Sequence, residues 1–448
     1  MNMKVLVIGG VAGGATFASQ LRMLDDQAEI IVFEKDGTMS FANCGMPYYL
    51  GGFVEEKEQL IAATPESFQK DKSIEVRIRH EVISINRSKK TLTINDHIQN
   101  EMYEETYDKL VYSPGAVPIV PDIEHLDRGN CYSLRSFKDM LKLDEHISGR
   151  SYQSACLVGG GFIGLEMAEN MKERGLDVHL VQRSGHVLNL LEPAFSEILE
   201  KELLQKGIDL HLNATVKRIN EDKSLLLSDG SEIEADFLLL AVGIKPNKHL
   251  AETAGLKIGE TGGVCVNEYM QTNDEDIYAI GDVIESIDYI TSQPKRVPLA
   301  WVAHREAYIA ARHMTGDSLP FKGILGTAIC KVFDQTAAVV GHSASSLTEM
   351  KIPFETAELT ARQHAGYYPG AAKLSLVIHF SHDDGKILGA QAVGEGADKR
   401  IDVISTAITG NLTVLDLQTL EIAYAPPYSA PKDPVNMLGY KAVKKVKK

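Results

Sequence analysis

The chain is poor in cysteine, and its few cysteines are scattered. Its 448 residues contain five of them, Cys44, Cys131, Cys156, Cys265 and Cys330. An odd, widely spaced set supplies neither a disulfide framework nor a Cys-x-x-Cys pair for metal binding or redox chemistry. Small disulfide-stabilised proteins are thereby excluded, and the pattern fits a reducing compartment.

Basic residues are outnumbered by acidic ones. The chain has 46 Lys and Arg against 61 Asp and Glu, which is a formal net charge of −15 at pH 7. A field of this sign repels nucleic acid and anionic lipid. We therefore expect neither as a partner, and an anionic ligand must be held by local basic groups.

Long hydrophobic runs and clustered metal ligands are also missing. The apolar start, residues 1–8, is too short for a signal peptide or a membrane span and passes directly into glycines, so we expect a cytoplasmic protein. His379 and His382 lack further ligands, so we expect surface histidines and no metal site. With 44% apolar and 24% charged residues the composition is that of a globular enzyme, and the length predicts about three domains.

What the chain does contain is an internal repeat. Two segments that begin about 150 residues apart share the order apolar strand, glycine turn, helix and apolar strand, which predicts two βαβ units of parallel sheets. The segments are Lys4–Ile8, a helix ending near Leu24 and Ile30–Phe33 in the first unit, and Ala155–Val158, a helix ending near Arg174 and Asp177–Val181 in the second.

Glycines in both turns predict dinucleotide sites, because a pyrophosphate must approach the backbone N–H groups at a helix start. The second turn matches Gly-x-Gly-x-x-Gly in full, whereas the first has Val11 in the middle position. The glycines are Gly9, Gly10, Gly13 and Gly14 in the first turn, and Gly159, Gly161 and Gly164 in the second.

The residue that ends each second strand separates the two ligands. Glu34 can accept both hydroxyl hydrogen bonds of an unmodified ribose, as in FAD. The corresponding residue of the second unit is Gln182, and Arg183 follows it. Because an arginine can hold a 2′-phosphate that a carboxylate would repel, we predict NADPH in the second unit, with NADH as the alternative.

Further strands and turns fit a flavoprotein that binds two nucleotides. Apolar strands lead into Ser113-Pro114-Gly115 and into Gly243, and these segments are expected to connect two domains. A buried strand ends in Gly281-Asp282, whose carboxylate can hold a ribityl hydroxyl. From about residue 326 the chain changes to strand-like runs, at Ala337–Val340 and Leu374–His379, which indicate a third domain.

Cys44 is the candidate nucleophile. It follows the acidic end of the first unit within the polar segment Ser40–Tyr49, where the crevice of the βαβ unit is expected to open. A thiol of ordinary pKa is only a few per cent thiolate at pH 7, so the anion needs stabilisation by nearby N–H groups or a flavin. The alternative is a small core residue.

Together these motifs resemble the FAD- and NAD(P)-dependent pyridine nucleotide-disulfide oxidoreductases over nearly the whole chain. Ser40–Gly45, His364–Gly370 and Tyr424–Asp433 are similar to the single-cysteine branch. The resemblance implies an α/β fold with two Rossmann-like domains, for FAD and NAD(P), and a C-terminal α+β dimerisation domain. The implied boundaries are 1–112 with 245–325 for FAD, 113–244 for NAD(P)H and 326–448 for dimerisation.

The resemblance also implies an activity, the NADPH-dependent reduction of coenzyme A disulfide to two coenzyme A thiols. Cys44 would form a mixed disulfide with coenzyme A, and FAD would carry the electrons. Tyr367 and Tyr424 would reach the active site of the partner in a homodimer and supply a proton to the leaving thiolate.

Other residues are assigned to ligands by the same resemblance. Met23 stands where we expect an arginine, and the neighbouring Arg22 is the substitute. Phe162 would cover the flavin until nicotinamide arrives, with core packing as the alternative. Ala300 joins the FAD residues named above, and the coenzyme A contacts would be Thr16, Gln20, Arg22, Ser40, Asn43, Lys72, His304 and Lys432.

Three other functions remain open. An NADH oxidase or peroxidase would use a cysteine sulfenic acid, but it usually has a histidine in the first glycine turn, where this chain has Val11 and Ala12. A coenzyme A persulfide or polysulfide reductase often carries a rhodanese domain, for which we expect no room here. An electron-transfer flavoprotein that serves a ferredoxin-like protein would need no cysteine at this position.

Overall fold

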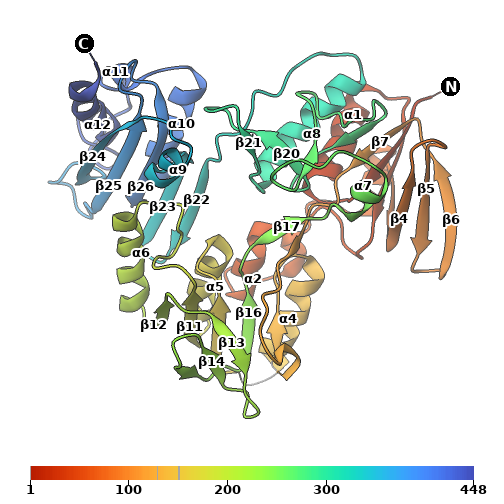
Figure 1. Ribbon diagram of the computed structural model, residues 1–448, viewed down its shortest axis with the longest axis horizontal. Helices are drawn as coiled ribbons and strands as arrows, with labels where there is room; N and C mark the ends of the chain where they lie inside the picture. Colours follow the sequence, from red (N-terminus) through yellow and green to blue (C-terminus); the bar gives the residue numbers. More distant parts are fainter. Residues whose placement is uncertain (1, 129, 150–151, 448) are drawn as a thin grey trace. The chain divides into compact units, whose positions relative to one another are not determined.

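The computed structural model, which describes residues 2–128, 130–149 and 152–447, divides the chain into two compact units (Figure 1). Each unit combines segments that are distant in sequence. The three domain boundaries predicted from the sequence are a finer division and stay a prediction. Unit 1 contains Met1–Val120, Ser133–Ser151 and Gly243–Ile324, and unit 2 contains Pro121–Tyr132, Tyr152–Val242 and Leu325–Lys448.

The centre of unit 1 is a five-stranded parallel sheet in the order β19-β7-β1-β2-β3. Its central strand β1 places Ile8 opposite both Phe33 of β2 and Tyr112 of β7. The side chains of Val5 to Ile8 in β1 are buried on both faces, as expected for a parallel sheet covered on each side. The strands are β1 (Lys4–Ile8), β2 (Glu29–Glu34), β3 (Glu75–Ile78), β7 (Lys109–Tyr112) and β19 (Ile277–Ala279).

Helices α1 (Ala12–Leu24) and α8 (Ala300–Met314) pack against each other in the same unit. Phe17 and Leu21 of α1 belong to one hydrophobic core with β1 and with the antiparallel sheet β4-β5-β6. Unit 1 also contains several further strands and helices. They include β4 (His80–Asn86), β5 (Thr91–Asp96), β6 (Glu101–Thr106), β8 (Ala116–Pro118), β17 (Ile244–Pro246), β18 (Val264–Cys265), β20 (Ile284–Ile287), β21 (Pro294–Lys295), α2 (Met46–Leu50), α3 (Pro65–Lys72), α4 (Phe137–Gly149) and α7 (His249–Thr253).

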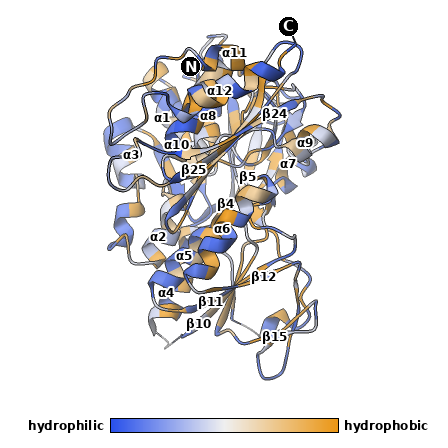
Figure 2. Ribbon diagram, turned by 90° about the vertical axis from the view of Figure 1, so that its left-hand side faces the viewer, coloured by the Kyte–Doolittle hydropathy of each residue, from blue (hydrophilic) through white to orange (hydrophobic). Residues whose placement is uncertain are grey.

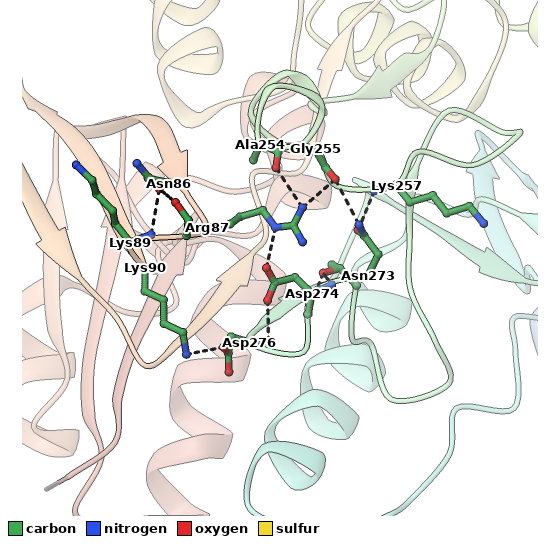
Figure 3. Close-up of polar contacts among 12 residues, drawn as sticks. Asn86, Arg87, Lys89, Lys90, Ala254, Gly255, Lys257, Asn273, Asp274 and Asp276 are labelled. Atoms are coloured by element: carbon green, nitrogen blue, oxygen red, sulfur yellow. Dashed lines mark hydrogen bonds and ion pairs between the residues drawn. The ribbon is translucent and has the colours of Figure 1, made fainter.

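A polar cluster joins two segments of unit 1 that are distant in sequence, Met1–Val120 and Gly243–Ile324 (Figure 3). Arg87, at the turn between β4 and β5, donates from Nε to Asp274 Oδ2 over 2.7 Å and from Nη1 to the carbonyl oxygens of Ala254 and Gly255. Lys90 and Lys109 both pair with Asp276. These bonds fasten the segment that leads into β19, the strand that Gly281-Asp282 follows.

Unit 2 repeats the parallel arrangement in the order β12-β11-β10-β16-β9. Helix α5 (Phe162–Glu173) follows β10, and α6 (Pro193–Gln205) shows its alternating apolar and polar residues in Figure 2. The small sheet β13-β14-β15 lies in the same part of unit 2, the segment Tyr152–Val242. The strands are β9 (Cys131–Tyr132), β10 (Ser154–Val158), β11 (Asp177–Gln182), β12 (Ile208–Leu212), β13 (Val216–Ile219), β14 (Leu225–Leu227), β15 (Glu232–Ile233) and β16 (Phe237–Leu240).

The C-terminal part of unit 2 is built on an antiparallel sheet in the order β22-β23-β26-β25-β24. Every residue of β26 is buried, because the strand lies at the centre of the sheet. The elements are β22 (Ala328–Val332), β23 (Gln335–Gly341), β24 (Glu355–Arg362), β25 (Lys373–Phe380), β26 (Ile387–Gly394), α9 (Ala344–Glu349), α10 (Ala397–Thr409), α11 (Val414–Leu417) and α12 (Pro434–Ala442).

The predicted βαβ units are confirmed, with strand ends within about one residue of those expected. One surface expectation is wrong. His379 is buried, because it lies on β25 inside the sheet, where Nδ1 is 2.9 Å from Thr356 Oγ1 and Nε2 is 3.2 Å from Glu192 Oε1. The histidine therefore belongs to a hydrogen-bonded core and not to the surface.

Candidate functional site

The first glycine turn forms a cradle at the carboxyl end of β1. Gly9 has φ of +97°, and a Cβ there would lie 2.1 Å from the Ser113 oxygen. A Cβ at Gly14 would lie 1.9 Å from the Gly9 oxygen, so the helix approaches the strand closely. A Cβ at Gly13 would lie 2.6 Å from Ser113 Oγ, a side-chain atom that would have to turn away. These contacts explain why glycine is needed at this turn.

Glu34 closes the cradle from the end of β2. Its Oε2 accepts the Gly10 N–H over 2.8 Å and its Oε1 accepts the Asp36 N–H over 2.9 Å. Burial raises the pKa of the Glu34 carboxyl, and the two N–H donors oppose this rise. Each carboxylate oxygen keeps a second lone pair for a ribose hydroxyl. The turn and the carboxyl together fit an adenosine diphosphate group such as that of FAD.

The second glycine turn has nearly the same geometry as the first, with the uncharged Gln182 in the place of Glu34. Gly160 N–H donates to Gln182 Oε1 over 2.9 Å, as Gly10 does to Glu34. Gly159 has φ of +113°, and a Cβ at Gly164 would lie 1.8 Å from the Gly159 oxygen. Gly161 has open space around it among the described residues, which leaves room for a pyrophosphate.

Arg183 and Phe162 stand beside this second turn. Arg183 is exposed, and the structure shows no hydrogen bond or ion pair for it with the described residues. Its guanidinium is therefore available to an anionic ligand. Phe162 begins α5 and is half-buried. Its predicted role over the flavin stays a prediction.

The two connecting segments meet in unit 1. β8, which follows Ser113-Pro114-Gly115, pairs antiparallel with β17, which follows Gly243. Gly115 and Gly243 have φ of +69° and +110°, and Ile119 N–H donates to the Gly243 oxygen over 3.0 Å. The segments that the sequence predicted as connections are thus hydrogen-bonded to each other.

Gly281-Asp282 carries two partners that the sequence analysis missed. Arg135 Nη2 lies 2.8 Å from Asp282 Oδ2, and Gly281 N–H donates to Glu306 Oε2 over 2.7 Å. Glu306 is buried on α8, which begins at Ala300, and burial raises its pKa to about 8. A carboxylate on the apolar face of a helix was the available signal. For Arg135, an isolated arginine in the sequence, no signal existed.

Cys44 lies in a one-turn 3₁₀-helix, Asn43–Gly45, directly before α2, and its side chain is exposed. The preceding Ser40 donates its N–H to the Gly10 oxygen over 2.8 Å, which fastens the cysteine segment to the first glycine turn. Asn43 Nδ2 donates to the Arg135 carbonyl oxygen over 3.1 Å. Arg135 therefore links the cysteine segment to Asp282.

The other four cysteines are not comparable with Cys44. Cys156 and Cys330 are buried, and burial raises the pKa of both thiols. Burial likewise raises the pKa of Cys131 to about 11, and it raises that of Cys265. Because the thiolate is the reactive form, these residues are poor nucleophiles. Exposure therefore agrees with sequence position in selecting Cys44.

The residues expected to contact coenzyme A lie in both units. Thr16 and Gln20 share one half-buried face of α1, and His304 lies on the neighbouring α8. Lys72 at the end of α3 donates from Nζ to Ser19 Oγ over 2.7 Å, beside that face. These residues, with Ser40 and Asn43, belong to unit 1, whereas the exposed Lys432 belongs to unit 2.

Arg22 is engaged within the fold. Four of its N–H groups donate to the carbonyl oxygens of Lys72, Asp25, Ala28 and Ser73. A phosphate would have to displace these bonds. Met23, beside it, is exposed. The structure thus gives no support for Arg22 as a replacement of the missing arginine.

Tyr367 and Tyr424 are brought together in unit 2. Their hydroxyl oxygens lie 3.2 Å apart, although the residues come from different loops. Both side chains are exposed, as expected, with 76% and 45% of their surfaces accessible. The hydrogen bond with Tyr367 raises the pKa of Tyr424. A paired phenol of this kind can donate one proton while its neighbour stabilises the remaining charge.

No group of three or more His, Cys, Asp or Glu side chains suited to a metal ion occurs among the described residues. The helices of this part of the chain also include none with the length and hydrophobicity required to cross a membrane.

Comparisons with known proteins place these features in context. Residues 3–307 match the family model described as pyridine nucleotide-disulphide oxidoreductase, and residues 327–434 match the dimerisation domain of that family. Coenzyme A disulfide reductase of Staphylococcus epidermidis is 41% identical over 446 residues, which cover 98% of this chain and 99% of that protein.

Solved structures agree with the sequence comparison. Reduced Bacillus anthracis CoADR-RHD matches with a TM-score of 0.98 and 43% identity, over 99% of this chain and 80% of that one. A NAD-dependent persulfide reductase from A. fulgidus matches with a TM-score of 0.95 and 36% identity, over 99% of this chain and 83% of that one.

Proposed function

Because this chain belongs to the pyridine nucleotide-disulphide oxidoreductases, we propose that it uses NADPH to reduce coenzyme A disulfide through the single cysteine Cys44. The enzyme is an NAD(P)H-dependent disulfide oxidoreductase that binds FAD; the substrate, the preference for NADPH and the one-cysteine chemistry are the proposal. The observation that supports it most directly is an exposed Cys44 fastened to the first glycine turn, with four other thiols of raised pKa.

The reaction needs only one protein sulfur because the substrate brings the others. The Cys44 thiolate attacks one sulfur of coenzyme A disulfide, so that a mixed disulfide forms and one coenzyme A thiolate leaves. Tyr424, paired with Tyr367, gives the leaving thiolate its proton and regains one from water. The first glycine turn and Glu34 would hold FAD, which would supply the route for two electrons from NADPH to the mixed disulfide. Cys44 is then a thiolate again, and the second coenzyme A leaves as a thiol.

We further propose a homodimer in which the tyrosine pair of one subunit acts at the Cys44 site of the partner. We also propose that the chain has the three domains predicted from the sequence. The match of residues 327–434 to a dimerisation domain supports the dimer. The exposure of both tyrosines in a single chain is consistent with a position at a subunit interface.

The preference for NADPH is proposed on the exposed Arg183 and the neutral Gln182. Replacing Arg183 by Ala should raise KM for NADPH about tenfold or more and leave KM for NADH nearly unchanged, because only NADPH carries the 2′-phosphate. Steady-state kinetics with both nucleotides measure the effect. An equal rise for both would remove Arg183 from the phosphate site.

The single-cysteine proposal is tested by turnover under anaerobic conditions. Wild type should reduce coenzyme A disulfide, and Cys44→Ser should lose this activity while NADPH still bleaches the flavin. The Cys156→Ser variant is the matched control and should keep the activity, since that thiol is buried. Disulfide turnover that survives in Cys44→Ser would refute the mechanism.

A persulfide reductase is the second candidate, since the A. fulgidus structure of that name is a neighbour at 36% identity. The same assay distinguishes the two. A kcat/KM for coenzyme A persulfide well above that for coenzyme A disulfide would favour the second candidate.

A further inference from the structure

The two tyrosines are carried by loops that have no regular secondary structure. Loop A, residues 363–372, connects β24 to β25 and contains Tyr367. Loop B, residues 418–433, connects α11 to α12 and contains Tyr424. Because exposed loops are flexible by default, the 3.2 Å contact between the two hydroxyl oxygens needs something to hold the loops together.

A buried arginine lies between the two loops. Arg400, on α10, is 2% exposed, and Asp433 at the end of loop B is 3% exposed. Arg400 Nη2 lies 2.9 Å from Asp433 Oδ2. The same nitrogen donates over 2.7 Å to the carbonyl oxygen of Gln363, the first residue of loop A. One guanidinium therefore bonds both loops.

Ser429 of loop B adds two hydrogen bonds to those that Arg400 makes with the two loops. Its hydroxyl donates to Asp433 Oδ2 over 2.6 Å, and its carbonyl oxygen accepts the N–H of Ala365 in loop A over 3.0 Å. Arg400 Nη1 also donates to the Gly396 oxygen of its own helix start. The guanidinium, the carboxylate and the serine form a closed network, with each loop held at its base and the tyrosines at the exposed end.

A buried ion pair of this kind is a weak source of stability, because desolvation of both charges offsets their attraction. It does fix the relative positions of the groups that it bonds, since the planar guanidinium directs several donors at fixed angles. Lysine has one nitrogen and cannot serve the carboxylate and the Gln363 oxygen with the same geometry. The choice of arginine at this position thus indicates that the relative placement of the loops matters.

We propose that Arg400 is the positioning residue of the tyrosine pair, holding loops A and B so that the hydroxyls of Tyr367 and Tyr424 meet and can protonate the departing coenzyme A thiolate. The kinetic part of this inference rests on the proposed function. The geometric part, that Arg400 sets the distance between the two phenols, does not.

The geometric part is tested by photochemical coupling of the phenols in the FAD-loaded full-length enzyme. Illumination with a ruthenium bipyridyl photo-oxidant and persulfate links neighbouring tyrosines, and peptide mass spectrometry locates the link. Wild type should form the link between Tyr367 and Tyr424, and Tyr367→Phe should not. Arg400→Lys should reduce its yield several-fold, whereas Lys399→Met, a neighbouring exchange on the same helix, should not change it.

Removal of the arginine alone would leave Asp433 buried and uncompensated, so Arg400→Met could fail to fold. The paired variant Arg400→Met with Asp433→Asn removes both charges and keeps a polar cap for α12, where Asp433 now accepts the Val435 N–H. FAD content and the thermal midpoint show that the variants are folded. An unchanged yield of the link in both folded variants would overturn the proposal.

The kinetic part is tested by separating the two half-reactions. Arg400→Lys should lower kcat for coenzyme A disulfide at least about tenfold, in line with the loss of a positioned proton donor. KM for NADPH and the anaerobic rate of flavin reduction should stay at their wild-type values. Adding Arg400→Lys to Tyr367→Phe, Tyr424→Phe should cause no further fall, because both changes remove the same contribution.

The outcomes distinguish the two proposals. A further fall of kcat in the combined variant, or a lower rate of flavin reduction by NADPH in Arg400→Lys, would assign Arg400 a general structural role and refute the positioning role. If wild type does not reduce coenzyme A disulfide, the proposed function fails, and the phenol link still decides whether Arg400 places the tyrosines.

Discussion

Single residues give the two nucleotide cradles their different charge. Glu34 and Gln182 accept the N–H of Gly10 and Gly160 over 2.8 and 2.9 Å, so the two sites share one geometry. Only the carboxylate would repel a phosphate on the ribose. In the proposed preference for NADPH, the change from a carboxylate to an amide removes the repulsion of a 2′-phosphate, and Arg183 adds an attraction.

A buried carboxyl, Glu306, leads to a prediction about stability against pH. Burial raises its pKa to about 8, the charge of Asp282 adds to the rise, and Arg305 and the Gly281 N–H oppose it. Unfolded, the group has a pKa of about 4.3. Between these values the folded chain holds a proton that the unfolded chain has released, so the free energy of unfolding falls as pH rises, by at most about 1.4 kcal/mol per pH unit.

Glu306→Gln should remove this contribution, because glutamine stays neutral and can still accept the Gly281 N–H. The thermal midpoint of the variant should therefore exceed that of wild type by more at pH 8 than at pH 5. Glu349→Gln, an exchange at an exposed position, serves as the control and should show no such trend. A midpoint difference that is the same at both pH values would contradict the raised pKa.

At the scale of elements, the two βαβ units repeat each other beyond their glycines. Ser40 and Leu188 follow β2 and β11 at corresponding positions, have φ of 43° and 44°, and donate N–H groups to the oxygens of Gly10 and Gly160. Non-glycine residues rarely adopt a positive φ. The repeat of this conformation shows that the turn after the second strand is fastened to the glycine turn in the same way in both units.

The two glycines of the second turn should respond differently to a methyl group. Gly159→Ala places a Cβ 2.5 Å from the Ala241 oxygen at φ of +113°, so we expect a loss of about 2 to 3 kcal/mol in the free energy of unfolding. Gly161→Ala has φ of −86° and open space among the described residues, so stability should stay within about 0.5 kcal/mol.

Thermal unfolding of the two variants checks this difference, and the nucleotide kinetics add a second measurement. Gly161→Ala should raise KM for NADPH, since the new methyl group occupies the space left for the pyrophosphate. Equal destabilisation by both substitutions would show that the positive φ and the close contact at Gly159 do not determine the loss of stability.

At the scale of the whole molecule, the proposed dimer predicts complementation between two inactive variants. Co-expressed subunits, one with Cys44→Ser and the other with Tyr367→Phe and Tyr424→Phe, form a mixed dimer. If the tyrosines serve the partner, one of its two sites has an intact cysteine and an intact pair. We therefore expect about half of the wild-type activity, whereas each parent alone should be at least about a hundredfold slower.

Purification through two different affinity tags isolates the mixed dimer for the assay. Activity no higher than that of the parents would mean that the tyrosines and the cysteine of one subunit work together. The mixed dimer of wild type with Lys399→Met is a control for the effect of the tags and should keep full activity.

Local patterns in the sequence determined much of the fold. Apolar strands followed by glycines were predictable at β1 and β10, because a parallel strand buried on both faces needs a continuous apolar run and a tight turn needs glycine. Glu34, Gln182 and Cys44 were found for the same reason, since their positions are defined by distance along the chain from those strands.

The tertiary structure alone decided what joins distant parts of the chain. The partners of Asp282 and Gly281, which are Arg135 and Glu306, lie in segments that no short-range pattern connects. His379 was misplaced on the surface because its polar ring was given more weight than the apolar run Leu374–Phe380 around it, and because its partners Thr356 and Glu192 are distant in sequence. Arg400, between two loops about 60 residues apart in sequence, was equally invisible. Periodicity and turn chemistry act over a few residues, whereas packing brings these groups together.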